Sequence, residues 1–160
     1  MANSHENRRG PLLTAGILIG AGMGGFVDGI VLHQILQWHN MLSSRIAPDT
    51  LVNSKINMFW DGIFHAGVWL MTALGIALLF HAGSRGEVLW SKRVFGGAVL
   101  LGYGLFNLIE GTINHQILGL HHVHEYAPNR GFYDAAFLMF GAVLVAIGWI
   151  MIRGEKKTGQ

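Results

Sequence analysis

The sequence predicts an all-α integral membrane protein, a four-transmembrane-helix bundle built from two parallel helical-hairpin repeats. Three observations lead to this fold class. Hydrophobic residues make up 51% of the chain and charged residues only 12%, about half the charged fraction of an ordinary soluble domain. The apolar residues gather in four runs of about twenty or more, the length at which a helix crosses the hydrocarbon core. A motif with one acid and two histidines also occurs twice.

The repeated motif lies near the end of the first and third apolar runs. Its first copy reads DGIVLHQILQWH from Asp28 to His39, and its second reads EGTINHQILGLH from Glu110 to His121. An acid, a glycine, the run HQIL and a second histidine recur at the same internal spacing. We interpret the motif as functional because charge and imidazole are costly inside a bilayer.

We expect a single domain over residues 1–160, with spans at residues 12–39, 58–80, 94–120 and 132–152. The first halves of the first and third spans are rich in glycine, and Gly16 and Gly20 form a small-xxx-small pair that lets helices approach closely in lipid. A turn signal at 48–50 precedes the second span. Because each repeat contains two spans, both copies would cross the membrane in the same direction.

Basic residues predict the orientation, because they are enriched in cytoplasmic connections. Most of the 11 Lys and Arg residues fall on the side of the two termini: Arg8, Arg9, Arg85, Lys92, Arg93, Arg153, Lys156 and Lys157. We therefore expect cytoplasmic termini and outward-facing motif ends. The net charge of +2 and the lack of a basic patch with interleaved aromatics argue against a nucleic-acid partner. The expected partner is the lipid bilayer. The glycine-rich helix faces also allow a homo-oligomer, and a respiratory or metal-trafficking protein is the alternative partner.

Residue counts along each span, at about 1.5 Å per residue, place seven ionisable groups in one layer of the outer half of the membrane. Such groups must pair, bind a metal or line a wet cavity. Imidazole and carboxylate ligands suit iron, copper or zinc, and one carboxylate per helix resembles di-iron and di-manganese bundle proteins. We predict a transition-metal site with one or two ions. Its expected ligands are His33, His65, His115, Asp61, Asp28, Glu110 and Asp134.

The spacing within the motif leaves one point open. Asp28 and His33 are five residues apart, as are Glu110 and His115, which separates them by about 140° on a regular α-helix. Either the helices bulge there, or the two acids lie outside the first coordination shell. The fourth span offers only its aspartate, with Leu138 where a histidine would be expected.

A second polar group lies further out. We expect it to form an access site for metal or protons at the outer surface, with the members His39, His121, His122, His124 and Glu125. The alternative for these histidines is an interfacial position at helix ends. The alternative for the inner set is a purely structural polar network.

The runs DGIVLHQILQWHNM and DGIFHAG and the loop HHVHE resemble a domain-of-unknown-function family of small four-span bacterial membrane proteins. The resemblance covers nearly all of the chain. It implies a protein of the bacterial inner membrane and carries no particular reaction with it. The positions that it implies to matter are Asp28, His33, His39, Asp61, His65, Glu110 and His115.

Several functions remain open at this point. The leading hypothesis is a membrane-embedded metal site near the extracytoplasmic face for redox or hydrolytic chemistry, and redox chemistry would make the protein a metal-dependent oxidoreductase. The second is copper or zinc handling or transport, which the histidine-rich loop favours. The third is a haem b cytochrome with His33 and His115 as axial ligands, which would leave the carboxyl groups unexplained. A proton or ion channel gives the histidine-rich loop no clear role.

Overall fold

The computed structural model describes residues 9–85 and 89–154, which contain helices and no strands. The helices are α2 (Gly10–Phe26), continued by the π-helix η1 (Val27–Ile35), α3 (Leu51–Ser84), α4 (Lys92–Glu110), continued by the π-helix η2 (Gly111–Ile117), and α5 (Arg130–Arg153). With each π-helix counted as part of the helix that it continues, 4 helices in this described part of the chain are long and apolar enough to cross a membrane. This confirms the all-α membrane fold class.

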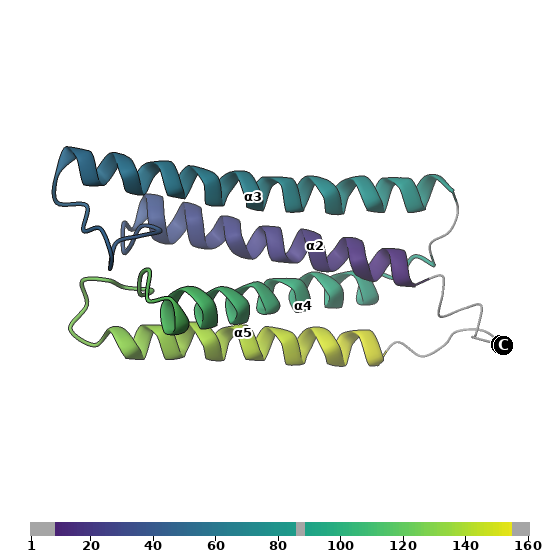
Figure 1. Ribbon diagram of the computed structural model, residues 1–160. Coiled ribbons are helices and arrows are strands. Elements are labelled where there is room, and N and C mark those ends of the chain that lie inside the picture. The colour runs from purple at the N-terminus through teal and green to yellow at the C-terminus, as the bar shows by residue number, and fades with distance from the viewer. Residues whose placement is uncertain (1–8, 86–88, 155–160) are drawn as a thin grey trace.

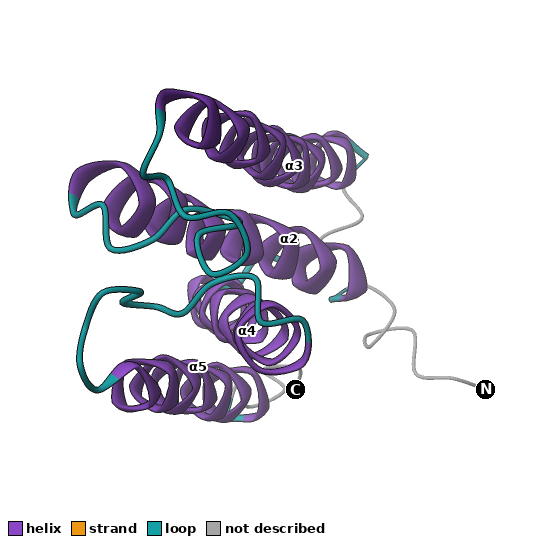
Figure 2. Ribbon diagram, turned by 60° about the vertical axis from the view of Figure 1, so that its left-hand side comes forward, coloured by secondary structure: helices purple, strands orange, loops and turns teal. Residues whose placement is uncertain are grey.

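The four helices lie side by side in the order α3, α2, α4, α5 (Figures 1 and 2). The central pair is α2 and α4, while α3 packs on α2 and α5 packs on α4. The bundle is therefore open, with α3 and α5 at opposite ends of a row. The loops 36–50 and 118–129 meet at one end of the helices, away from the described ends of the chain (Figure 1).

Glycine lets the two central helices touch. A Cβ built on Gly20 would lie 2.7 Å from the carbonyl carbon of Val99, and one built on Gly102 would lie 2.7 Å from the carbonyl carbon of Ile17. A side chain at either glycine would overlap the neighbouring backbone. Close van der Waals packing of this kind drives helix association in lipid, where water does not. These glycines thus mediate contact between two helices of the same chain. The contact sets the distance between the two helices that carry the motif copies.

The outer helix α3 is longer than expected because its start is capped. It begins at Leu51 rather than near residue 58, since the Thr50 hydroxyl accepts a hydrogen bond of 3.1 Å from Asn53 N and thereby satisfies a free donor of the first turn. Along its length large apolar side chains face outward, among them Trp69 and Phe80, which are 61% and 77% exposed. An apolar surface of this extent suits contact with lipid acyl chains.

Candidate metal centre

The end of each central helix is wound as a π-helix, which resolves the spacing question raised by the motif. Hydrogen bonds in a π-helix join residues five apart, so these residues share a face. Oδ2 of Asp28 lies 3.2 Å from Nε2 of His33, and Oε1 of Glu110 lies 3.3 Å from Nε2 of His115. The helices bulge, and the acid and first histidine of each copy lie side by side.

The second histidine of each copy returns to the same place through a chain reversal. Behind each π-helix, a backbone hydrogen bond spanning six residues closes the helix end, 2.9 Å long in the first copy and 2.8 Å in the second. The turning residue has a left-handed backbone, with φ 52° at Gln37 and 54° at Gly119, as is typical of a Schellman helix end. The first and third helices therefore end at Ile35 and Ile117, short of the expected ends of their spans at residues 39 and 120. The glycine at 119 was the sequence signal for this ending.

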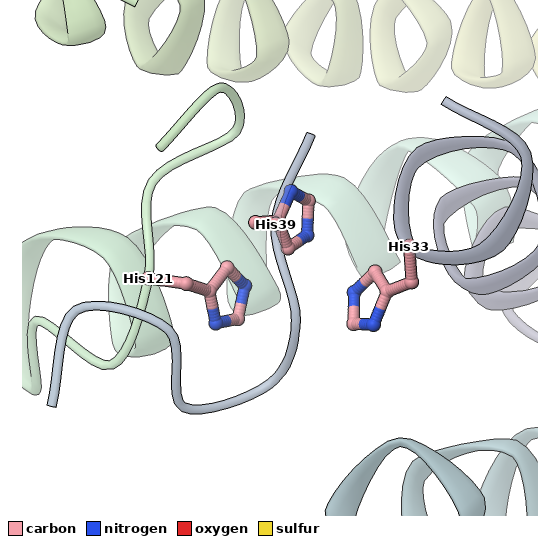
Figure 3. Close-up of side chains that lie close together, drawn as sticks. All are labelled: His33, His39 and His121. Atoms are coloured by element: carbon pink, nitrogen blue, oxygen red, sulfur yellow. The ribbon is translucent and has the colours of Figure 1, made fainter. Parts of the chain in front are cut away.

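Four imidazole rings consequently meet in a continuous row, in the order His33, His39, His121, His115. Successive ring centroids are 4.3, 4.4 and 4.8 Å apart, and Figure 3 shows the first three rings close together. All four residues are at most 3% exposed. His39 and His121 therefore do not lie at the outer surface as expected, because the reversal folds them back beside the helix ends.

The two middle rings are anchored by carbonyl groups of the opposite loop. Nδ1 of His39 lies 2.9 Å from the carbonyl oxygen of Val123, and Nδ1 of His121 lies 3.0 Å from that of Met41. A carbonyl oxygen only accepts hydrogen bonds, so Nδ1 donates in both rings. Burial, and then the neighbouring imidazoles of His121 and His33, lower the pKa of His39 well below its usual value. This ring is therefore neutral, with a lone pair on Nε2.

A carboxylate from an outer helix lies beside Nδ1 of each end ring. Nδ1 of His33 lies 3.0 Å from Oδ1 of Asp61 on α3, and Nδ1 of His115 lies 3.6 Å from Oδ1 of Asp134 on α5. A backbone N–H of the nearer loop donates to the same oxygen of each acid, over 2.8 and 2.9 Å. Both acids are 2% exposed. The four carboxyl groups thus converge from four helices. Asp61 holds the His33 ring by a hydrogen bond, whereas Nδ1 of His115 makes none.

Inside the row, the Nε2 atoms of the imidazole rings face one another and the carboxylate oxygens of Asp28 and Glu110, without a proton donor between them. A neutral ring with its proton on Nδ1 presents a lone pair at Nε2. Nε2 of His121 lies 3.1 Å from Oε1 of Glu110, which also only accepts when ionised. Buried polar atoms left without a partner destabilise a fold by about 1–3 kcal/mol each, so a cation or additional protons would stabilise this arrangement. The buried atoms here that make no hydrogen bond include both carboxylate oxygens of Asp28, Oε2 of Glu110, and Nε2 of His33, His39 and His115.

Among the residues that the structure describes, two groups of side chains are compact enough to hold one ion each. The first is His33, His39 and His121, and the second is Glu110, His115 and His121. Within each group the ligand atoms lie within 4.8 Å of one another. Asp28 adds a carboxylate to the first group, since its oxygens lie 3.2 Å from His33 and 3.8 Å from His39. His121 is close enough to serve either group.

His65 does not join these groups, although the sequence placed it among the ligands. Its Nδ1 lies 2.6 Å from the carbonyl oxygen of Asp61 in the preceding turn, and its ring packs against Gly29, where a Cβ would lie 2.8 Å from Cε1. Leu138 packs in the same way against Gly111, where a Cβ would lie 2.9 Å from Cδ2 of Leu138. An apolar side chain thus fills the matching position on α5, and the geometry gives His65 a packing role.

The remaining polar residues of the expected outer-surface site fasten the loops. Nδ1 of His122 lies 2.6 Å from Oδ2 of Asp134, with the His122 side chain 31% exposed. The ring of His124 stacks on Trp38, with centroids 4.7 Å apart. Glu125 is buried and accepts hydrogen bonds from both loops, 2.6 and 3.0 Å long. These contacts join the loops to each other and to α5, and they do not form a further compact group of ligands within residues 9–85 and 89–154.

Comparison with known proteins agrees with the membrane fold. A family model described as "Predicted membrane protein (DUF2243)" matches residues 15–155. The matched range includes every residue of the imidazole row and all four converging acids. No curated protein and no solved structure matches the chain.

Proposed function

The chain belongs to a family of predicted membrane proteins, DUF2243, and we propose that it binds two transition-metal ions within the membrane. Asp28, His33 and His39 would hold one ion, Glu110 and His115 would hold the other, and His121 would complete the second site. The observation that carries the proposal is the convergence of four imidazole Nε2 atoms with the carboxylates of Asp28 and Glu110, where Nε2 of His33, His39 and His115, both oxygens of Asp28 and Oε2 of Glu110 make no hydrogen bond.

The charge of the site supports the same reading. Four buried acids converge, and the ion-pair partners of all four within the described residues are histidines. An uncompensated carboxylate is strongly disfavoured in a low-dielectric interior. Two divalent cations would balance four carboxylates. A purely structural network would instead require additional protons on the rings or acids.

The ligand chemistry narrows the metal. The chain has no cysteine, and imidazole with carboxylate suits iron, copper(II) or zinc. Hydrogen bonds from Nδ1 to a carboxylate or carbonyl are the usual outer support of a metal-binding histidine, because they fix the tautomer and orient the ring. Such an ion supplies Lewis-acid or redox chemistry; with redox chemistry the protein would be a metal-dependent oxidoreductase.

Two other functions receive less support. A haem b between His33 and His115 would require the space that the rings of His39 and His121 fill, with centroids 4.3 and 4.8 Å from their neighbours. Copper or zinc handling would use the same ligands as the proposed site. The near-complete burial of all four rings favours a resident ion over a cargo.

We place the site near the extracytoplasmic face of a bacterial inner membrane, with both termini in the cytoplasm. The support is the positive-inside rule. The described basic residues of the opposite end are Arg9, Arg85, Lys92, Arg93 and Arg153. The others used for the orientation, Arg8, Lys156 and Lys157, lie outside the described residues.

Metal analysis of purified protein tests the proposal. After growth with iron, copper and zinc, wild-type protein should carry close to two ions per chain. The double variant His39→Asn/His121→Asn should fall below one, because an asparagine amide can replace Nδ1 as the donor to the carbonyl but offers no Nε2. His81→Asn, at the exposed opposite end, is the matched control and should keep the wild-type content. Fewer than one ion per wild-type chain, or full content in the double variant, would overturn the proposal.

A further inference from the structure

A cavity of about 420 Å³ opens beside the first half of the imidazole row. We call it the access cavity. Its walls come from the end of η1, the loop that follows and the start of α3. The lining includes His33, Gln34, Gln37, Asn40, Ser54 and Met58. Of the four rings, His33 alone lines this cavity, which therefore connects one end of the row to the outside.

The chemistry of the access cavity suits a hydrated cation. Its polar wall groups are amides and hydroxyls, and its lining contains no Lys or Arg. The amides of Gln34 and Asn40 donate to Oδ2 of Asp61 over 3.4 and 2.8 Å, which leaves their carbonyl oxygens as acceptors. A hexahydrated ion, at roughly 30 Å³ for each water, occupies about 180 Å³. The cavity can hold such an ion without removing its water.

Negatively charged side chains lie at the inner end of the access cavity. Beneath His33 lie the carboxylates of Asp28 and Asp61, at 3.2 and 3.0 Å from its ring nitrogens. At the mouth, Tyr126 lies near charges of both signs, Glu125, Asp49 and Arg130, and Glu125 pairs with Arg130. The two carboxylates beneath the floor therefore supply the attraction for a cation.

One residue of the cavity is held in a strained conformation. Gln37 has φ 52°, a left-handed conformation that a non-glycine residue adopts only with strain. The matching residue of the second copy is Gly119, with φ 54°, which adopts it without strain. The first copy thus carries an amide side chain at this position, where it lines the cavity, whereas the second copy has no side chain there.

The second half of the row is covered by basic groups. Arg45 donates to the carbonyl oxygen of Leu118, and its guanidinium would lie 3.5 Å from a Cβ at Gly119. Arg130 pairs with Glu125 at 3.1 Å. His122, at the position that matches Asn40, lies against Asp134. The Arg45 guanidinium on this side would repel an approaching cation, whereas the charge of Arg130 is balanced by Glu125.

We propose that divalent metal ions enter the site from the outer surface through the access cavity, lose their water beside His33, and pass from the first position to the second. This inference rests on the proposed metal site and adds a route and a direction to it. It assigns Gln34, Gln37 and Asn40 as the residues that receive the hydrated ion.

The rate of metal loading tests the route separately from the capacity. Metal-free protein in lipid nanodiscs is mixed with Co²⁺, and its visible absorption is followed over time. Ser54 and Met58 lie four residues apart on one face of α3, so Ser54→Phe/Met58→Trp fills the cavity without touching a ligand. Loading should slow by about tenfold, a barrier increase of roughly 1.4 kcal/mol, with the final absorption unchanged.

Two controls separate blockage from general disturbance. Ser54→Ala/Met58→Ala changes the same positions without filling the cavity and should load at least as fast as wild type. Gly131→Trp adds an indole at the matching place on α5, where a Cβ meets nothing within 4 Å, and should load at the wild-type rate. Wild-type loading by the filled variant, or equal slowing by Gly131→Trp, would overturn the route alone. No Co²⁺ absorption from wild-type protein at equilibrium would overturn the metal site itself.

Discussion

The two halves of the imidazole row are alike where they hold the rings and different where they meet the outside. In each half, an acid from the central helix faces Nε2 and an acid from the outer helix faces Nδ1 of the first ring. The outer surroundings differ, with amides and an open cavity on one side and arginines on the other. The shared groups are those that a metal site requires, and the differing groups are those that would control access.

The largest expected effect is the loss of one ion from either half. After loading to equilibrium, His33→Ala should abolish the first metal position and leave the second, because it removes a ligand and leaves the access cavity open to ions that pass to the second position. His115→Ala should do the reverse, because each ring belongs to a different compact group. Metal content should fall from about two ions to about one per chain in each variant. Loss of all metal from either variant would show that the two halves hold a single shared ion.

A smaller effect is expected from the acids that support the rings. Asp61→Asn and Asp134→Asn keep an acceptor for the loop N–H but remove the charge facing Nδ1, and loss of such an outer partner typically lowers metal affinity about 10–100-fold. The loss should be greater for Asp61→Asn, since Asp61 lies 3.0 Å from its ring and Asp134 lies 3.6 Å from its own.

Competition with a chelator of known affinity measures the metal dissociation constants of the two variants. Asp49→Asn, an acid in the exposed part of the loop, is the control and should match wild type. Equal affinities in wild-type protein and both variants would mean that these acids do not support metal ligands.

The smallest effect concerns the two reversals. Gly119→Ala should destabilise the folded protein by about 1 kcal/mol, because alanine is strained in a left-handed conformation. Gln37→Gly should relieve the equivalent strain and gain at most about 1 kcal/mol, since glycine also loses more chain entropy on folding. Thermal unfolding in detergent compares the two. Stabilisation by Gly119→Ala would contradict the assigned backbone geometry.

The sequence was sufficient to predict four membrane-spanning helices and the convergence of one acid from each. Apolar runs determine the first, and residue counts from the helix ends determine the depth of Asp28, Asp61, Glu110 and Asp134. It was not sufficient for the positions of His39 and His121. A regular helix carried through the motif places them further out, whereas a π-helix and a left-handed turn bring them back into the site.

The role of His65 shows a second limit. Its spacing from Asp61 is correct for two ligands on one helix face, but the bulge of η1 brings the backbone at Gly29 against its ring. Sequence spacing describes a single helix and contains no information about which neighbour fills the space beside it. The open order α3, α2, α4, α5 depends in the same way on contacts between helices, which glycine positions indicate without specifying the partner.

A metal-resolved structure tests the central claim most directly. Anomalous scattering from crystals of metal-loaded protein should give two peaks in the imidazole row. One should lie about 2.0–2.1 Å from Nε2 of His33 and His39, and the other at the same distance from Nε2 of His115 and His121. No peak among these rings, or peaks only beside His122 and His124, would contradict the account.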